Sequence, residues 1–316
     1  MTSAPSSRDS SLMTEVAAEQ EKRSAALTSV LAAIILTSLK LGIGSYTNSL
    51  GILSEAAHSG LDLLATLVTL YAIHSSMKPA DEQHHYGHGK IENLSALFET
   101  SLLLVTCGWI LYESVSRLFF RHVAVDPSLW AFIIMAFSII VDYSRSRILL
   151  DTARKYKSQA LEADALHFRT DIWSSAVVIL GLIGVWVSRL NTGLQILGDA
   201  DAIAAVFVAA IIVYVSARLG ARTIYDLMDS APEGLKERIR DEIEQIPGIY
   251  DCHRVRVRTS GGRVFVDVHV CVDEKQSLEK AHQLSDQAEL AVKKIAGNAD
   301  VVVHVEPASR GHHPHH

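Results

Sequence analysis

The sequence lacks the features that mark secreted, nucleic-acid-binding or hydrolytic proteins. Its three cysteines form no CxxC motif, so they indicate no disulfide framework and fit a reducing cytosol or a lipid environment. The net charge is −6 and no basic arm is present, so nucleic acid is not an expected partner. There is no HExxH motif, and the polar N-terminal segment has no signal-peptide apolar core.

Charge is also scarce, because only 20% of the residues are charged and 49% are hydrophobic. The mean hydropathy of +0.21 indicates a membrane protein whose polar residues are concentrated in separate segments. Six apolar segments are each long enough for a spanning helix of about 20 residues. They cover about residues 25–44, 50–75, 94–119, 129–146, 161–187 and 202–221.

Lysine and arginine gather in the leader, in the 77–90 loop, in the 145–157 stretch and at Arg218 and Arg222. Six spans place both termini on one side of the membrane, and the positive-inside rule makes that side cytoplasmic. The short loops and the absence of a targeting segment favour a bacterial inner membrane. The predicted domains are a disordered leader (1–22), a six-helix transmembrane domain (23–222), a cytoplasmic metal-binding domain (223–308) and a His-rich tail (309–316).

The composition from Asp226 onward is that of a soluble domain. We expect a helix over 232–245, strands over 250–258 and 263–272 joined by a turn, a helix over 278–295 and a strand over 300–305. This αββαβ order predicts a small α+β domain similar to a ferredoxin-like or metallochaperone-like fold. The fold class is therefore an α-helical membrane protein with a C-terminal cytoplasmic α+β domain.

Two of the apolar spans each contain a histidine four residues before an aspartate. Residues at i and i+4 share one face of a helix, so each pair presents an imidazole beside a carboxylate. Ionisable groups at membrane depth are costly and usually mark an ion or proton path. A lone histidine of this kind is more often a core residue, but two such pairs could supply two N and two O ligands to Zn²⁺ or a similar ion. These four residues, called the quartet below, are His58, Asp62, His167 and Asp171.

Two more carboxylates, Glu55 and Asp164, precede the quartet histidines by one helical turn. Each could orient an imidazole through its other ring nitrogen or simply line an aqueous cavity.

Histidines are abundant outside the spans, since the chain has 15 of them. The 77–90 loop holds Asp81, Glu82 and three histidines within eight residues, which fits a small metal site or a flexible loop at an aqueous interface. In the C-terminal domain, neighbouring strands could bring four ligands together and a helix could add His282, unless these histidines decorate strand ends by chance. The four strand residues are His253, His269, His304 and Glu306. The His-rich tail is assigned no function.

Together the six spans, HSGLD (58–62), ADALHFRTD (163–171), PADEQHHYGHGK (79–90) and the αββαβ domain resemble the cation diffusion facilitator family over residues 25–307. The resemblance implies a transport site at the quartet, a loop site at Asp81, His84 and His88, and a binuclear cytoplasmic site. That last site would comprise His253, His269, His282, His304 and Glu306. It also implies a homodimer, cytoplasmic domains that close on metal binding, and exchange of metal for protons.

Two positions depart from the family pattern. Many bacterial relatives have Asp where His58 stands, whereas zinc-selective animal relatives have His, and the position of Glu306 is often Asp. Lys90 and Asp229 resemble an interlock between the membrane and cytoplasmic parts, although snorkelling and helix capping would explain them equally well.

The predicted function is proton-coupled efflux of a divalent transition-metal cation, by a secondary transporter that is not an enzyme and carries no prosthetic group. Mixed N₂O₂ donors suit Zn²⁺ best; Fe²⁺ and Co²⁺ also fit, while Mn²⁺ prefers more oxygens and Cd²⁺ softer donors. The expected partners are divalent metal ions, protons, the lipid bilayer and a second copy of the chain. A membrane-anchored metal sensor is the alternative from another class, but a sensor would not need ligands buried in two spans.

Overall fold

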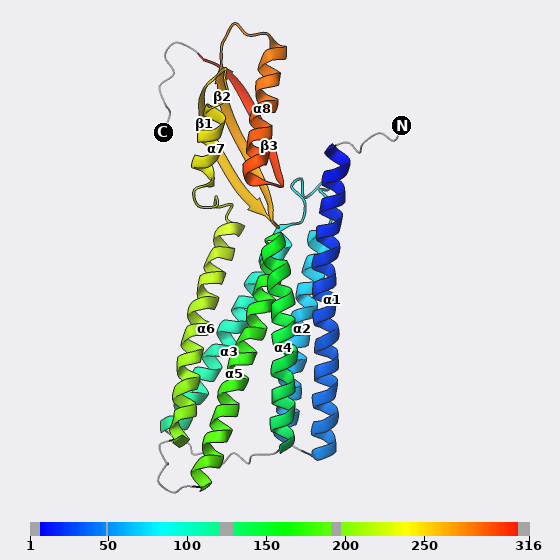
Figure 1. The fold of residues 1–316 in the computed structure, drawn as a ribbon, viewed down its shortest axis with the longest axis vertical. Helices are drawn as coiled ribbons and strands as arrows, with labels where there is room; N and C mark the ends of the chain where they lie inside the picture. Colours follow the sequence, from blue (N-terminus) through cyan, green and yellow to red (C-terminus); the bar gives the residue numbers. More distant parts are fainter. Residues whose placement is uncertain (1–6, 49, 120–128, 191–196, 309–316) are drawn as a thin grey trace. The chain divides into compact units, whose positions relative to one another are not determined.

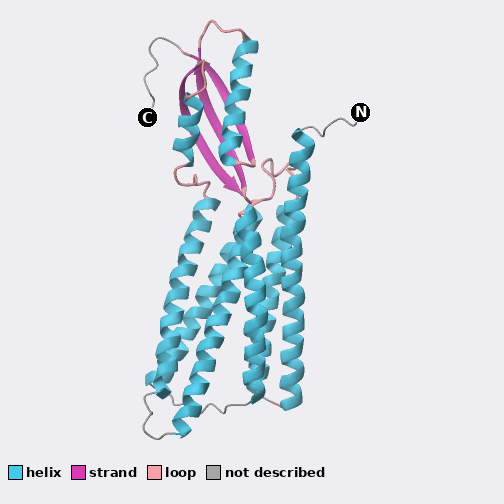
Figure 2. Cartoon of the chain, viewed as in Figure 1, coloured by secondary structure: helices cyan, strands magenta, loops and turns pink. Residues whose placement is uncertain are grey.

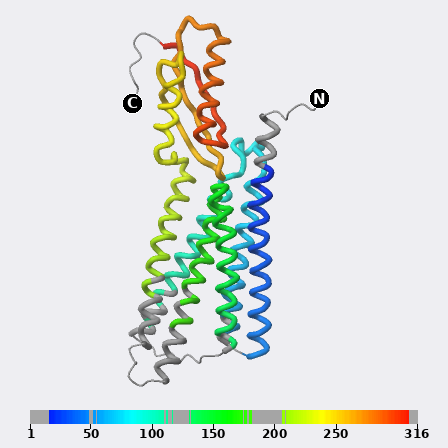
Figure 3. Tube along the Cα trace, in the orientation of Figure 1, coloured from blue at the N-terminus to red at the C-terminus, as the bar shows by residue number. Residues whose placement is uncertain are grey.

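The computed structural model describes residues 7–48, 50–119, 129–190 and 197–308. The chain divides into two compact units, Met1–Thr223 and Ile224–His316. Strands occur only in the second unit within the described chain (Figure 2). Figure 3 follows the same path as a Cα trace.

The first unit consists of long helices that run side by side (Figure 1). Each of the six predicted spans lies within one of these helices, which confirms the six-helix prediction. The helices extend beyond the apolar segments; the basic 145–157 stretch, for example, forms the end of the fourth helix. Their bounds are α1 Ser7–Thr47, α2 Leu50–Ser76, α3 Lys90–Phe119, α4 Leu129–Tyr156, α5 Gln159–Leu190 and α6 Leu197–Leu227.

The helical unit is apolar outside and partly polar inside. Large side chains such as Ile35, Leu64 and Val105 are exposed, whereas Thr66 and Glu99 are fully buried. So much exposed apolar surface is unusual for a soluble protein and is expected where lipid covers the helices. Among the described residues, the stretches Val16–Thr47 and Glu55–Ser76 are long and apolar enough by themselves to cross a membrane.

The leader differs from its prediction, because helix α1 already begins at Ser7 rather than after residue 22. The segment from Ala17 to Lys22 consists of strong helix formers, so it continues the helix of the following apolar span. Two ion pairs fix it against the bundle: Lys155 Nζ lies 2.6 Å from Glu21 Oε2, and Lys22 Nζ lies 2.6 Å from Glu92 Oε1. The predicted tail, 309–316, lies outside the described residues.

Glu92 of α3 is 1% exposed, and its buried carboxylate contacts residues from several helices. Besides Lys22 of α1, it accepts hydrogen bonds from Ser76 of α2, at 3.1 Å, and from Ser158, which directly precedes α5. A buried carboxylate needs such partners, because leaving it uncompensated among apolar helices costs several kcal/mol.

The second unit has the predicted αββαβ order. A two-residue turn at Gly261 and Gly262 joins the first two strands; both glycines have positive φ, 58° and 81°, which suits a tight hairpin. The strand order is β1-β2-β3, with β1 and β2 antiparallel and β2 and β3 parallel. The elements are α7 Leu235–Glu244, β1 Ile249–Ser260, β2 Arg263–Val272, α8 Leu278–Ala296 and β3 Ala299–Pro307.

The two helices of this unit pack on one face of the sheet. Alternate valines of β2, from Val264 to Val272, form the core with Ile239 and Ile243 of α7 and Leu284 of α8. Because side chains alternate across a strand, the intervening residues His269 and Cys271 lie on the other face. That face carries the histidines predicted to bind metal.

Replacing Lys22 by Met should destabilise the helical unit more than replacing Lys155 by Met. Lys22→Met leaves the buried Glu92 carboxylate without its cation, which should lower the free energy of unfolding by about 3–5 kcal/mol. Lys155 and Glu21 form an exposed pair that water and salt screen, so Lys155→Met should change the free energy of unfolding much less. Thermal unfolding in detergent micelles, followed by circular dichroism, compares the two variants, and equal losses would contradict this account of Glu92.

Candidate metal centre

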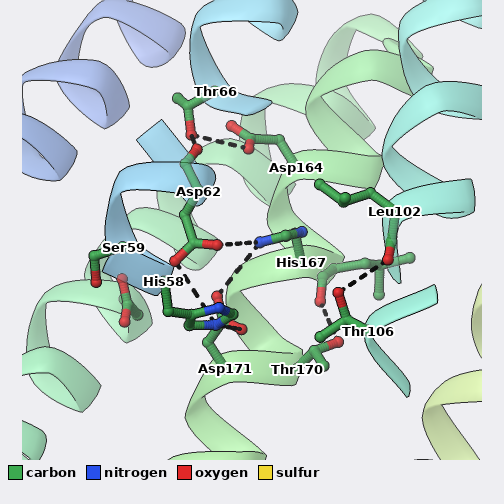
Figure 4. Close-up of polar contacts among 12 residues, drawn as sticks. His58, Ser59, Asp62, Thr66, Leu102, Thr106, Asp164, His167, Thr170 and Asp171 are labelled. Carbon is green, nitrogen blue, oxygen red and sulfur yellow. Dashed lines mark hydrogen bonds and ion pairs between the residues drawn. The ribbon is translucent and has the colours of Figure 1, made fainter. Parts of the chain in front are cut away.

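Helices α2 and α5 bring the four quartet side chains together, as Figure 4 shows. His167 Nε2 lies 3.0 Å from Asp62 Oδ1 and 3.7 Å from Asp171 Oδ2. His58 Nε2 lies 3.9 Å from Asp62 Oδ2 and 3.8 Å from Asp171 Oδ1. Each carboxylate therefore lies between two imidazoles, one from each helix.

The quartet is unevenly exposed, since the His167 side chain is 4% exposed and that of His58 is 41% exposed. The ligand atoms of His58, Asp62 and Asp171 all lie within 4.8 Å of one another, and His167 Nε2 contacts both carboxylates of this group. Two carboxylates buried in an apolar helix bundle require positive charge close by. A divalent cation or protons on the imidazoles would supply it, so the arrangement can hold a metal ion or exchange it for protons.

The structure adds one carboxylate to this centre that the sequence analysis did not single out. Glu99 of α3 is fully buried, and its Oε2 lies 3.7 Å from His167 Nδ1. Neither of these two atoms has a hydrogen-bond partner among the described residues, while Glu99 Oε1 accepts a 3.0 Å hydrogen bond from Thr69. The one available signal was a glutamate near the start of the third apolar span.

The two carboxylates that could either orient the histidines or line a cavity, Glu55 and Asp164, contact other side chains. Glu55 pairs with Lys40 Nζ at 3.3 Å, and the same ammonium donates a 2.7 Å hydrogen bond to Ser59. Asp164 is buried and lies 3.5 Å from Thr66 Oγ1. By geometry, Glu99 is better placed than either to contact a quartet imidazole.

The loop group, Asp81, His84 and His88, comes together in the connection between α2 and α3. Asp81 Oδ1 lies 3.1 Å from His84 Nδ1, and Asp81 Oδ2 lies 3.3 Å from His88 Nε2. The backbone N–H of His84, and then that of Gln83, donate to Asp81 and lower the pKa of its carboxyl, so it stays ionised. The neighbouring His85 is directed to the carbonyl of Glu82 instead.

The face of the sheet opposite α7 and α8 is called the open face below. On this face, Glu306 of β3 lies close to one histidine from each of the three strands. Its carboxylate oxygens lie 2.7 Å from His269 Nδ1, 3.4 Å from His253 Nε2 and 3.6 Å from His304 Nε2. The hydrogen bond from His269, followed by the charges of the histidines, lowers the pKa of the Glu306 carboxyl. We call these four residues the sheet group.

The structure does not bring His282 to the sheet group. His282 lies on α8, its side chain is 76% exposed, and its ring Nε2 is 3.9 Å from Asp286. Helix α8 packs against the other face of the sheet, which separates His282 from the group within one chain.

The two residues of the predicted interlock belong to different units. Lys90 begins α3 in the first unit, and Asp229 follows α6 in the second with a φ of 61°. Their interlock stays a prediction.

Comparisons with known proteins cover nearly the whole chain. Residues 26–228 match the family model described as cation efflux transmembrane domain, and residues 231–308 match that of the cation efflux protein, cytoplasmic domain. The cation-efflux pump FieF of Serratia proteamaculans (strain 568) is 31% identical over 292 residues, which cover 91% of this chain and 93% of the relative. The FieF pump of Yersinia enterocolitica serotype O:8 / biotype 1B (strain NCTC 13174 / 8081) is 30% identical over 290 residues, with the same coverage.

A solved structure of a single-residue variant of the MamM CTD is 26% identical and covers 24% of this chain and 96% of its own, with a TM-score of 0.24. The family models and the pumps extend over both units described above. The chain therefore belongs to the cation diffusion facilitator family, whose members are integral membrane transporters of divalent metal cations and not enzymes.

Proposed function

We propose that this protein exports divalent transition-metal cations from the cytoplasm in exchange for protons, with Zn²⁺ as its principal substrate. The observation that carries the proposal is the convergence of the quartet from two apolar helices onto one small volume. Membrane-buried ionisable residues usually mark an ion pathway, and these four are also a complete set of ligands. The relatives' name, cation-efflux pump, gives the direction of transport.

The donor set supports zinc. Two imidazole nitrogens and two carboxylate oxygens can form the tetrahedral site that Zn²⁺ adopts most readily in proteins. Fe²⁺ and Co²⁺ accept similar donors, while Mn²⁺ prefers more oxygen ligands and Cd²⁺ softer ones. His58 sets the preference of the quartet among these ions, because an aspartate at that position would turn an N₂O₂ donor set into an NO₃ donor set.

Proton exchange follows from the chemistry of the same ligands. Imidazole binds a metal ion only when neutral and carboxylate only when ionised, so protons and metal compete for the quartet. An inward-open state at cytosolic pH would take up the ion. An outward-open state facing a more acidic medium would protonate the histidines and release it. Alternating access between these two states makes the transporter an antiporter.

We assign Glu99 the role of positioning His167. A metal-binding histidine usually donates its second ring N–H to a carboxylate or carbonyl, which fixes the tautomer and the ring orientation. Here Nε2 of His167 faces the quartet carboxylates, and Nδ1 faces Glu99. A proton held on Nδ1 leaves the Nε2 lone pair free for the ion.

The remaining metal-binding groups fit the cytoplasmic side of such a transporter. We place the helices in the inner membrane of a bacterial cell and both termini in its cytoplasm. The reason is that lysine and arginine gather in the leader, in the 77–90 loop, in the 145–157 stretch and at Arg218 and Arg222. The loop group would collect ions before transport, and the sheet group would bind them as regulatory ligands. The family model matched by the C-terminal domain bears the name ZT_dimer, which supports a homodimer. We further propose that the two cytoplasmic domains of this dimer close when they bind metal.

Metal-coupled proton flux in proteoliposomes tests the role of the quartet. His58→Ala and Asp171→Ala should abolish it, because each variant removes one quartet ligand. His74→Ala is the matched control, since His74 is an exposed histidine of the same helix, and it should keep wild-type flux. Zn²⁺ flux and proton flux are recorded together with two fluorescent indicators, with and without a pH gradient.

Other outcomes of this experiment would contradict the proposal in distinct ways. Wild-type flux in both variants would remove the quartet from the pathway. A metal flux that is equal with and without the pH gradient would indicate a channel. Metal binding by the wild type without any metal flux would indicate a sensor.

The second prediction concerns the identity of the metal. We expect initial rates in the order Zn²⁺ before Co²⁺ and Fe²⁺, with Mn²⁺ slowest, when these ions and Cd²⁺ are compared in one vesicle assay. His58→Asp should lower the ratio of the Zn²⁺ rate to the Mn²⁺ rate, because it replaces a nitrogen donor by oxygen. An unchanged ratio would show that His58 does not select the ion.

The third prediction tests Glu99 as a positioning residue. Glu99→Gln keeps the size of the side chain but removes the carboxylate, so the KM for Zn²⁺ should rise by about 10–100-fold. The maximal rate should change much less, and Glu99→Asp should restore part of the affinity. Glu55→Gln serves as the control because Glu55 pairs with Lys40, and equal KM values for Glu55→Gln and Glu99→Gln would refute the assignment.

A further inference from the structure

The open face of the C-terminal sheet carries two adjacent rows of potential ligands. Antiparallel pairing places His253 opposite His269 and Asp251 opposite Cys271. Parallel pairing continues the rows to His304 and Glu306, respectively. Residues two apart on a strand share a face, so both rows lie on the side of the sheet away from the core that packs on α7 and α8.

Asp251 and Cys271 of the second row form a group with His253 of the first row. Asp251 Oδ2 lies 2.8 Å from His253 Nδ1, and Cys271 Sγ lies 3.9 Å from the same nitrogen. One potential ligand atom from each of these three residues lies within 4.8 Å of the others. The opposite ring nitrogen, His253 Nε2, faces Glu306 and the sheet group at 3.4 Å.

We propose that Asp251, His253 and Cys271 form a second metal site in this domain, which shares His253 with the sheet group and is selective for Zn²⁺ and Cd²⁺. A carboxylate, an imidazole and a thiolate are a usual donor set for tetrahedral Zn²⁺, with water at the fourth position. Bonds of about 2.0–2.3 Å place such donors roughly 3.5 Å apart, so small side-chain rotations close the site. Binding forms a metal–sulfur bond at Cys271 and releases the thiol proton to solvent.

The thiolate gives this site a different preference from every other group described in the structure. The quartet, the loop group and the sheet group offer only nitrogen and oxygen donors. A sulfur ligand favours Cd²⁺ and Zn²⁺ over Mn²⁺ and Mg²⁺. The site would therefore let the domain distinguish softer ions from harder ones.

His253 links the new site to the sheet group. A neutral imidazole has one nitrogen lone pair, so His253 ligates an ion on one side at a time. An ion at Asp251 and Cys271 holds Nδ1 and leaves the Nε2–H to hydrogen-bond Glu306. An ion in the sheet group takes Nε2 and leaves the Nδ1–H to Asp251. Occupation of one site thus weakens the other.

The chain offers a close control for the role of the thiol. Cys252 is also buried and adjacent to His253, but it belongs to the core that packs against α7 and α8. Cys107 lies in α3. Serine at either position leaves the proposed ligands in place.

The test is titration of the full-length protein in detergent with Cd²⁺, followed by thiolate-to-Cd²⁺ charge-transfer absorption in the ultraviolet. Wild type, Cys252→Ser and Cys107→Ser should show the band, and Cys271→Ser should lose it. Asp251→Asn should weaken Cd²⁺ binding about tenfold while keeping the band at saturation. Glu306→Gln, which disrupts only the sheet group, should keep the band with equal or higher affinity.

Three results would overturn the proposal: no band in the wild type, a band that survives Cys271→Ser, or a band lost in Cys252→Ser. Circular dichroism confirms that each variant is folded, and Asp251→Asn tests the site with every thiol intact. The readout is independent of transport, so loss of the band and failure of the proposed antiport are separate outcomes.

Discussion

A charged group inside an apolar helix bundle must be compensated, and much of this structure depends on how that is done. Glu92 is compensated by Lys22, and Asp142 by Arg145, at 2.6 Å and 3.2 Å. These fixed ion pairs join α1 to α3 and stabilise α4. The quartet carboxylates instead face imidazoles, whose charge depends on protons. A mobile cation could replace those protons, and for this reason we propose the quartet, rather than the fixed ion pairs, as the transport site.

The C-terminal domain carries histidines and carboxylates, as the quartet does, but on a sheet rather than inside an apolar helix bundle. The valines of β2 alternate along the strand, so they lie on one face of the sheet, and α7 and α8 pack against that face. Among the described residues of this domain, no helix packs on the other face, which carries histidines, carboxylates and a cysteine at neighbouring positions. The metal binding that we propose on this face would need no charge at membrane depth. His253, with one nitrogen toward each group, is where the two would communicate.

The elements were largely predictable from the sequence, because hydrophobic period and length are local signals. Strand β2 was predicted at its observed bounds, and each predicted span lies inside one helix. The errors lie where polar sequence continues a helix. Residues 7–22 read as a disordered leader because they lack apolar periodicity, but their helix propensity and the pairing of Lys22 with Glu92 extend α1. Composition alone does not reveal a partner 70 residues away.

The sequence by itself determined the six spans, the αββαβ domain and the presence of a His-xxx-Asp pair on each of two spans, since i,i+4 spacing defines a helix face. Only the tertiary structure decided which faces meet. It directed Glu55 to Lys40, brought Glu99 of α3 against His167, kept His282 on the far side of the sheet, and set Asp251 opposite Cys271. The physical reason is the same in each case: local periodicity fixes where a side chain points on its own element, whereas packing and strand register fix what it meets.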